Sequence, residues 1–594
     1  GPTTPIDSIT PEQFEKVYQQ TQQECEHHHQ QSNQLAIIRF ICMFIAILSL
    51  LIAYFQTISW LYIMSLMSLI LFVILVVIHN RIKNEYQQLK ATGKVYQKHL
   101  DRITGRWREF LHTGDEYLDE KDYKSLDLDV FSKNSLFQMI NIAFSQKGQK
   151  RLAELLIKDS QRDEILQRQA AVKELAENED FVFQLETLGY LIPTKKTKTI
   201  DQWIALVHQQ KVSTITPAIF IVSFLTILGL LGLCFQIGAP YSQVLFEVGV
   251  VFQLGFVILN LKKHQELFAP IEDLSQGLES YAQCYAHIHN CEYHCEYLRY
   301  LKNKMCIEGK AVEGILELSK LAQRVIYRHN IFAFLFLNGL GLFDFYLRNQ
   351  YAKWLNEYGQ LVACWFDGLA EIEALMSLSV LKIDDFKVTL PQITEEKTLS
   401  FQQLCHPLID QKQVVGNDFS MEKPLCIITG SNMSGKTTFM RTIGLNLILA
   451  YAGGYVFGES LQCSCLHIMT SMRVKDNVEE GVSTFYGELL RIKDMIQYAK
   501  KKEPMLCLID EIFKGTNSLD RIAGAKATIE KLSLPYSYTF LTTHDLELSR
   551  IQQMNYHFDE YYQDGQIYFD YQIKKGPSKS TNGQFLLKQL GILE

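Results

Sequence analysis

The fold of this chain is decided by one short stretch, Gly430-Ser431-Asn432-Met433-Ser434-Gly435-Lys436-Thr437. It matches the pattern G-x-x-x-x-G-K-[ST], which forms a phosphate-binding loop when a strand precedes it and a helix follows it. Both neighbours are present, because residues 425–429 read as a buried strand and residues 438–449 have helical spacing. The stretch therefore predicts a nucleotide-binding α/β domain.

The residue types in this loop suit phosphate chemistry. The glycines let backbone N–H groups curl around phosphate, and the N-terminus of the following helix favours negative charge. Lys436 is expected to bridge the β- and γ-phosphate oxygens, and Thr437 to ligate Mg²⁺. We therefore expect ATP and Mg²⁺ as cofactors. The expected nucleotide-binding residues are Gly430, Ser431, Asn432, Met433, Ser434, Gly435, Lys436, Thr437 and Thr438.

A second buried strand is expected at residues 505–509, and it ends in two acids, Asp510 and Glu511. Asp510 is expected to hold magnesium through water, and Glu511 to orient or deprotonate the attacking water. A strand that simply ends in solvated acids is the alternative. The phosphate loop upstream favours catalysis.

A long apolar stretch lies near the N-terminus, since residues 40–80 contain no Asp, Glu, Lys or Arg. One bilayer crossing needs about 20 residues. The stretch therefore divides into spans near residues 35–55 and 60–78 that turn at Gln56-Thr57-Ile58-Ser59. We expect a transmembrane hairpin over residues 35–79.

A second apolar block gives another hairpin, at residues 216–261, with an interruption at residues 236–241. Glu247 is its one acid, and a pair of buried core helices is the alternative interpretation. A third apolar stretch, residues 331–343, is too short to span a bilayer. We expect it to be a core helix.

Basic residues set the expected orientation of the hairpins, because cytoplasmic flanks carry an excess of Lys and Arg. They lie on the side of the long soluble segments, and both tight turns have none. The flanking residues are Arg39, Arg81, Lys83, Lys211, Lys262 and Lys263. We expect an integral membrane protein with four transmembrane helices, with both termini and the nucleotide-binding domain in the cytoplasm.

The rest of the chain divides by composition. Residues 1–34 are a polar N-terminal cytoplasmic segment, and residues 80–215 and 262–390 have helical spacing with few strands expected. From Pro391 the pattern alternates between strand and helix, so residues 391–594 form the α/β domain. A net charge of −7 argues against a chain that coats nucleic acid through overall basicity. The expected fold is an α-helical membrane and lever/core region followed by a C-terminal α/β ABC-type P-loop ATPase domain.

Four motifs in the C-terminal domain resemble, in order and spacing, the ATPase domain of MutS-type proteins. They are residues 429–438, Gly481-Val482-Ser483-Thr484-Phe485, Asp510-Glu511-Ile512-Phe513-Lys514-Gly515-Thr516-Asn517, and Thr543-His544. The tail is similar too, with Gly576-Pro577-Ser578-Lys579-Ser580 and Asn582-Gly583. Upstream, segments at residues 126–128, 135–137, 148–152, 365–366 and 370–378 resemble the MutS core domain. The resemblance covers about residues 126–210 and 330–594.

The resemblance implies an ABC-type ATPase that works as a homodimer. Each nucleotide is then held between one subunit's phosphate loop and the partner's Ser483-Thr484 signature. By the same resemblance Asn432 contacts the γ-phosphate and His544 is a catalytic switch histidine, although a satisfied core histidine is the alternative. The residues expected near the nucleotide base are His406, Pro407, Asn417 and Asp418.

Departures from the family limit what the resemblance implies. No mismatch-recognition domain fits residues 1–80, and the second hairpin stands where the family has a DNA clamp between its lever helices. Lys514 replaces the usual Arg, which alone offers a planar fork of donors. No dimerising helix-turn-helix extension is visible after the ATPase, so the dimer is expected to need another source of stability.

These observations favour a membrane-anchored, MutS-like, Mg²⁺-dependent ATPase whose lever helices carry dimer closure to the membrane spans. One alternative is a membrane-tethered DNA-binding repair or recombination factor, and another is an ABC-type transporter or membrane-remodelling ATPase. DNA is a less favoured partner than the lipid bilayer, and protein partners stay unknown. Cys284, His287, Cys291 and His294 fall on one face of an expected helix, where a packing seam is favoured over a zinc site.

Overall fold

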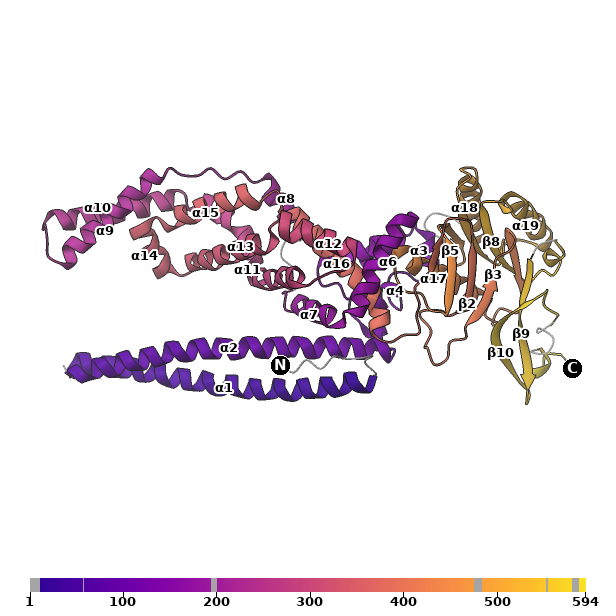
Figure 1. The fold of residues 1–594 in the computed structure, drawn as a ribbon, viewed down its shortest axis with the longest axis horizontal. Coiled ribbons are helices and arrows are strands. Elements are labelled where there is room, and N and C mark those ends of the chain that lie inside the picture. Colours follow the sequence, from indigo (N-terminus) through magenta and orange to yellow (C-terminus); the bar gives the residue numbers. More distant parts are fainter. Residues whose placement is uncertain are drawn as a thin grey trace.

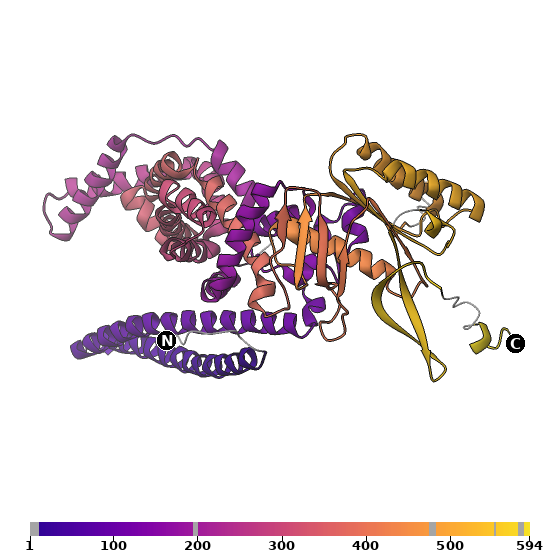
Figure 2. The same cartoon turned by 45° about the vertical axis from the view of Figure 1, so that its right-hand side comes forward.

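The computed structural model describes residues 11–56, 58–193, 200–474, 483–551, 554–579 and 587–593. A long helical region lies at one end and an α/β domain at the other (Figures 1 and 2). This order of a helical region and a C-terminal α/β domain confirms the coarse fold class predicted from the sequence. Thr57, Gly481, Val482, Ser580, Asn582 and Gly583, which the sequence analysis named, lie outside the described residues.

The first hairpin consists of α1 (Pro11–Gln56) and α2 (Ser59–Ile103). Each helix is about 68 Å long at 1.5 Å per residue and continues past the apolar stretch into polar sequence, so neither ends at the expected boundaries 34/35 and 79/80. Ser65 and Ser68 of α2 donate hydrogen bonds of 2.8 Å to backbone carbonyls of α1. These hydrogen bonds join the two apolar helices directly.

The second hairpin consists of α9 (Phe220–Cys234) and α10 (Tyr241–Leu259). Small residues bring the two helices close, since a Cβ added at Gly229 would lie 2.8 Å from the backbone nitrogen of Phe246. By length and composition alone, α1, α2, α9 and α10 are each able to cross a membrane. The sharply bent pair α14 and α15, with 82° between its helices, is a fifth candidate.

Helix α14 (Ile331–Gly341) corrects one prediction. It is not a core helix, because Phe332 is 82% and Phe336 is 65% exposed. It lies beside α9 and α10, away from the sheet (Figure 1). The length argument distinguished only a span from a core helix, and it missed a short apolar helix that lies against a hairpin.

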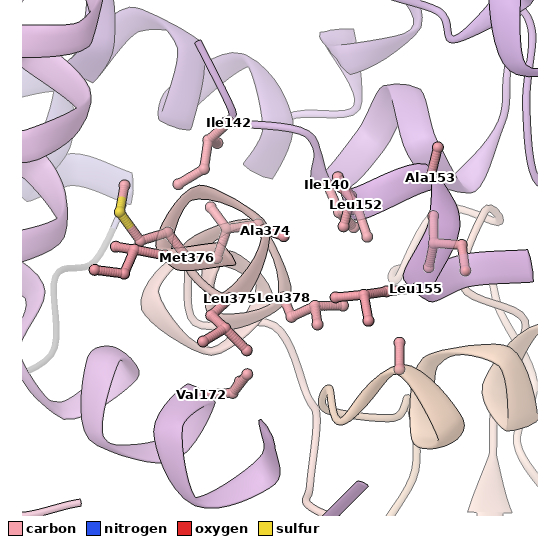
Figure 3. Packing of buried hydrophobic residues seen from close by; sticks show 14 of the residues in the cluster. Ile140, Ile142, Leu152, Ala153, Leu155, Val172, Ala374, Leu375, Met376 and Leu378 are labelled. Carbon is pink, nitrogen blue, oxygen red and sulfur yellow. The ribbon is translucent and has the colours of Figure 1, made fainter. Parts of the chain in front are cut away.

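The helical region between the hairpins and the sheet is built around α16 (Val362–Ile383), which is buried along most of its length. Side chains of α16 pack between α5 (Gln146–Ile157) and α6 (Arg162–Glu177), as Figure 3 shows for Leu375, Leu378, Leu155 and Val172. The other helices of this region are α3 (Tyr123–Asp127), α4 (Leu136–Ile140), α7 (Glu179–Tyr190), α8 (Ile200–Gln209), α11 (Leu261–Asn290), α12 (Glu296–Lys302), α13 (Ala311–Ile326) and α15 (Phe343–Tyr358).

The cysteine and histidine cluster does not lie on one helix as expected. Helix α11 ends at Asn290, so Cys291 and His294 fall beyond it. Cys284 is buried within α11, and His287 stacks on Phe181 of α7 and bonds its carbonyl. Across the described part of the chain no group of three or more His, Cys, Asp or Glu could hold a metal ion.

The α/β domain contains two sheets. Its main sheet has the strand order β10-β9-β4-β8-β7-β6, in which β10 alone runs antiparallel to its neighbour. Those strands are β4 (Leu425–Thr429), β6 (His467–Ser471), β7 (Met505–Asp510), β8 (Ser537–Thr543), β9 (Met554–Gln563) and β10 (Gln566–Lys575). The smaller sheet, in the order β1-β5-β2-β3, has β1 (Gln392–Thr394), β2 (Leu399–Leu404), β3 (Asn417–Ser420) and β5 (Ser460–Ser464). The domain's helices are α17 (Lys436–Ala452), α18 (Thr484–Ala499) and α19 (Ser518–Leu532).

A buried carboxylate joins α16 to the start of α5. Glu373 accepts hydrogen bonds from the backbone of Phe144 and Ser145 and from the Ser145 hydroxyl. Burial raises the pKa of Glu373 to about 7, although these hydrogen bonds favour its charged form. Gly148 leaves the room for it, because a Cβ there would lie 2.5 Å from the carboxylate.

We predict that Gly148→Ala destabilises the protein, since overpacking a buried site costs about 1–3 kcal/mol. The matched control is Gly255→Ala, in another helix, where an added Cβ meets nothing within 4 Å. The denaturant midpoint of the purified protein should fall for Gly148→Ala and hold for Gly255→Ala. Equal midpoints for both variants would contradict the packing described here.

Candidate nucleotide-binding site

The loop between β4 and α17 has the shape that the sequence predicts. Gly430 and Gly435 have φ values of 143° and 112°, a region that favours glycine. A Cβ added at Gly430 would also lie 2.7 Å from the carbonyl oxygen of Phe558 in β9. Lys436 is buried at the start of α17, and its Nζ donates a 2.6 Å hydrogen bond to the carbonyl of Gly430. The lysine therefore lies along the inner edge of the loop.

Two expected metal ligands, one after β4 and one at the end of β7, meet across the end of β8, which lies between those strands. The hydroxyl of Thr437 donates to Oδ2 of Asp510 at 2.9 Å. The other oxygen, Oδ1, accepts from the hydroxyl of Thr542 at 2.5 Å. The oxygen of Thr542 in turn accepts from the backbone N–H of Glu511 at 3.0 Å. Thr542, which the sequence analysis did not single out, thus fixes the positions of both acids.

Both the backbone and the carboxylate of Glu511 are held in place by their surroundings. Its φ of 49° is a left-handed conformation that a non-glycine residue rarely adopts outside functional sites. One carboxylate oxygen lies 2.6 Å from Nε2 of His544, and the other lies 3.1 Å from Nζ of Lys514. The hydrogen bond from His544 lowers the pKa of Glu511 to about 2 against the opposing effect of burial, and Lys514 lowers it further. The carboxylate is therefore ionised at neutral pH.

His544 lies between Glu511 and the phosphate loop. Its Nδ1 lies 3.2 Å from the carbonyl oxygen of Gly430 and 3.4 Å from Nζ of Lys436. The side chain is 47% exposed, which excludes the alternative of a satisfied core histidine. The structure thus brings Lys436, Thr437, Asp510, Glu511 and His544 together, as the sequence motifs suggested.

The signature segment lies at the start of α18 and contacts the loop that follows Glu511. The hydroxyl of Ser483 accepts a hydrogen bond from the backbone N–H of Tyr486 and so caps the helix. Phe485 packs on this loop, because a Cβ added at Gly515 would lie 2.9 Å from the Cβ of Phe485. Burial raises the pKa of Glu488 to about 7, while backbone N–H groups of Lys514 and Phe513 favour its charged form. A shift of α18 would therefore move the loop that carries Lys514.

The residues expected near the base take part in local contacts. The amide of Asn417 bridges to β10, donating to the carbonyl of Tyr571 at 3.0 Å and accepting from the N–H of Ile573 at 2.8 Å. Asp418 accepts from the backbone of Gln403. His406 and Pro407 are buried, and burial, reinforced by Arg441, lowers the pKa of His406 to about 4.

Tyr571 was missed by the sequence analysis. Its ring faces the phosphate loop, since a Cβ added at Gly435 would lie 3.1 Å from Cδ1 of Tyr571. The tyrosine has a φ of 53° and is 45% exposed, so an aromatic face is available at the mouth of the loop. Nothing in its spacing marks it, because it lies 135 positions after Lys436.

A buried ion pair ties the signature helix to the helical region. Asp127 of α3 accepts from Arg491 of α18 at 2.7 Å and from the hydroxyl of Thr470 in β6 at 2.7 Å. It also accepts from the backbone N–H groups of Met472 and Arg473. The sequence analysis quoted residues 126–128 as family-like but gave Asp127 no role. The structure places it at the junction of α3, β6 and α18.

Comparison with known proteins agrees with this geometry. Residues 426–591 match the family described as MutS domain V. The chain is 30% identical over 259 residues to the DNA mismatch repair protein MutS of Aquifex pyrophilus, covering 42% of this chain and 30% of that protein. It is 32% identical over 241 residues to MutS of Haloquadratum walsbyi, covering 38% of this chain and 25% of that protein.

A eukaryotic relative shows the same partial match. The DNA mismatch repair protein MSH3 of Candida glabrata is 33% identical over 263 residues, which cover 41% of this chain and 25% of that protein. The chain thus spans about a quarter to a third of the length of these curated relatives. The C-terminal part of the chain is therefore MutS-like.

We predict that His544→Asn raises the pKa of Glu511 more than Lys514→Met does, because the hydrogen bond from His544 is the largest single cause of the lowered value. The carboxyl titration can be followed by infrared difference spectroscopy, with Glu511→Gln identifying the signal. Equal shifts in the two variants would show that His544 does not dominate the site.

Proposed function

We propose that this protein is a membrane-anchored, MutS-like, Mg²⁺-dependent ATPase of the ABC type, in which ATP-driven closure of a homodimer moves the helical levers and the transmembrane hairpins. One observation carries the proposal: Lys436, Thr437, Asp510, Glu511 and His544 converge at the carboxyl ends of β4, β7 and β8. The match to MutS domain V supports the MutS-like ATPase part of this proposal.

The residues suit a nucleoside triphosphate and its metal. The loop is shaped by glycines where a side chain would collide, and Lys436 lies along it. The oxygens of Thr437 and Asp510, 2.9 Å apart, are the hard donors that Mg²⁺ prefers. Thr437 and Asp510 would hold Mg²⁺, which supplies charge neutralisation of the phosphates when bound. Tyr571 offers an aromatic face beside the same loop.

Glu511 is placed to act on the attacking water. The hydrogen bond from His544 lowers the pKa of its carboxyl group. The ionised carboxylate is then able to accept a hydrogen bond from that water and to orient or deprotonate it. His544 fixes one carboxylate oxygen, whereas Lys514, whose side chain is 69% exposed, is able to give up the other to that water.

The position of Ser483 at the start of α18 supports the proposed homodimer. Ser483 caps α18, so its hydroxyl and the first backbone N–H groups of the helix lie together at a helix N-terminus, which attracts phosphate. In the proposed homodimer this end faces the partner's phosphate loop and completes its site. Closure of the dimer would then displace α18. The ion pair between Arg491 and Asp127 would pass this displacement to the helical region.

A second buried cluster extends this route to the first hairpin. His99 of α2 lies 2.6 Å from Asp384 at the end of α16 and 2.7 Å from Glu186 of α7, and Arg102 of α2 lies 2.7 Å from Asp384. Burial alone would lower the pKa of His99, but Asp384 and Glu186 raise it to about 9. The hairpin is thus fastened where α16 leads into the α/β domain.

The proposal places the apolar parts of α1 and α2, near residues 35–55 and 60–78, together with α9 and α10 in a lipid bilayer, with both termini and the ATPase domain in the cytoplasm. Their length, apolar composition and exposed apolar side chains support this placement. A transporter is less well supported, because a group of polar side chains within the second hairpin is taken up by mutual hydrogen bonds. Gln253 is the centre of that network, with Ser223 and Thr226 as its partners.

DNA repair is the second candidate, because the relatives are named DNA mismatch repair proteins. Lys147, Lys150 and Arg151 form a small basic cluster that could touch phosphate, and two of the three are paired with acids of the same chain. Lys147 pairs with Asp367 at 2.6 Å, and Arg151 pairs with Glu371 at 2.5 Å. This pairing favours the membrane ATPase over a DNA-binding function.

We predict that Glu511→Gln lowers ATP turnover by at least about 10²-fold, the scale of a lost positioned acid–base group, and leaves ATP binding intact. Lys436→Ala should weaken ATP binding itself. Steady-state hydrolysis and nucleotide binding of the purified protein measure both, with the surface change Glu503→Gln as control. Full turnover in Glu511→Gln would remove this residue from the mechanism.

Mixed dimers test the composite site. Neither Lys436→Ala nor Ser483→Arg homodimers should hydrolyse ATP, because each lacks one half of every site. Mixing the two variants should restore one site per dimer, since one subunit then supplies an intact loop and the other an intact signature. If verified mixed dimers stay inactive, the signature does not act on the partner's nucleotide.

We predict that the detergent-solubilised protein shows no preference for mismatched over matched duplex, and that DNA does not stimulate its ATPase at physiological salt. Residual binding through phosphate contacts would fall with salt at a slope of about −0.9 per contact. A titration of labelled duplexes at several salt concentrations measures both. A mismatch preference of about tenfold, or ~1.4 kcal/mol, would make DNA repair the leading function.

A further inference from the structure

We propose that α14 is a fifth membrane-embedded helix, one that lies in the bilayer beside α9 and α10 without crossing it and that turns its apolar face to lipid acyl chains. This inference rests on the proposed membrane placement of the second hairpin, and it extends the membrane unit of that hairpin from two helices to three. It assigns a place to the one apolar stretch that the sequence analysis put in the core.

The exposed face of α14 is apolar throughout and continues the faces of the hairpin. Ile331, Phe332 and Phe336 are exposed on α14, as are Phe224 on α9 and Val251 on α10. An exposed apolar surface that extends over three neighbouring helices is rare in soluble proteins and marks an interaction site. Because the face runs on from two helices proposed to lie in lipid, lipid is its partner too.

An apolar cavity between α9 and α14 strengthens the case for acyl chains. Its volume is about 260 Å³, and Phe220, Ile227, Phe336, Leu340 and Phe343 contribute to its lining. Such a lining offers dispersion contacts to a hydrocarbon chain.

At each end of α14, a side chain bonds backbone groups that the helix itself leaves free. A membrane interior contains no water to satisfy free backbone groups. At the N-terminus, the side chain of Asn330 accepts from the backbone N–H groups of Phe332 and Ala333. At the C-terminus, the amide of Gln253 in α10 donates to the carbonyl of Gly339 at 2.8 Å. The cap from Gln253 also fixes α14 to the hairpin.

The geometry shows why the helix does not cross. Its 11 residues span about 16 Å at 1.5 Å per residue, roughly half of the ~30 Å hydrocarbon thickness. Leu342, with a φ of 49°, then turns the chain by 82° into α15. Asp344, two residues further on, is buried and bonds Arg328 at 3.0 Å and 3.2 Å. Arg328 precedes α14 and Asp344 follows it, so the ion pair holds both chain ends on one side.

Photo-crosslinking in a bilayer tests this inference. The full-length protein is reconstituted into phosphatidylcholine vesicles with p-benzoylphenylalanine in place of Phe332, and in a second variant in place of Phe336. The aromatic substitution keeps the size and polarity of each site close to the original. Parallel variants carry the same probe at Phe224 of α9, as the reference for lipid contact, and at Tyr486 of α18, which is exposed in the ATPase domain.

The adducts identify what covers α14. We expect phosphatidylcholine adducts at Phe332 and Phe336 with a yield matching that at Phe224. No lipid adducts should form at Tyr486. Adducts at Phe224 without adducts on α14 would overturn the inference and leave the membrane anchor standing. A covalent dimer through Phe332 would overturn it in favour of a second copy of the chain. Loss of lipid adducts at Phe224 as well would overturn the membrane placement itself.

Discussion

A single carboxylate with no access to solvent, that of Asp384, joins the first hairpin to the helical region. It lies at the end of α16, where the chain leaves the helical region for the sheets, and it bonds His99 and Arg102 of the first hairpin. Removing one partner from a buried ion pair of this kind costs about 3–5 kcal/mol, because a charge is left without compensation. The cluster therefore fixes the angle at which the hairpin leaves the helical region.

The Asp384 cluster has a counterpart at the other side of the helical region. Asp127 joins α3 to the signature helix through Arg491, and α16 packs between α5 and α6 with almost no exposed surface. Well-packed cores of this kind transmit displacement because they cannot deform continuously. In the proposed mechanism, a movement that starts at Ser483 reaches the first hairpin through the buried contacts of Asp127, α16 and Asp384.

The sequence predicts the chemistry better than it predicts the mechanics. The phosphate loop and the acids after β7 follow local patterns, because each element is set by neighbours a few residues away. Asp127 and Arg491 are 364 positions apart, and His99 and Asp384 are 285 apart, so no local pattern pairs them. Helix α14 was misplaced for a related reason, since its apolar composition fits a core and only its packing on α9 and α10 shows the exposed face. The ionised state of Glu511 likewise depends on His544 and Lys514 meeting it in space.

The central claim is that nucleotide-driven closure moves the hairpins relative to each other. The most direct measurement is the distance between spin labels on Trp60 of α2 and Phe235 at the tip of the second hairpin, both exposed, in reconstituted Glu511→Gln protein. The account predicts that this distance changes when ATP and Mg²⁺ are added. In the double variant that also carries Lys436→Ala, the distance should stay unchanged. An unchanged distance, measured while the ATPase domains close around ATP, would contradict it.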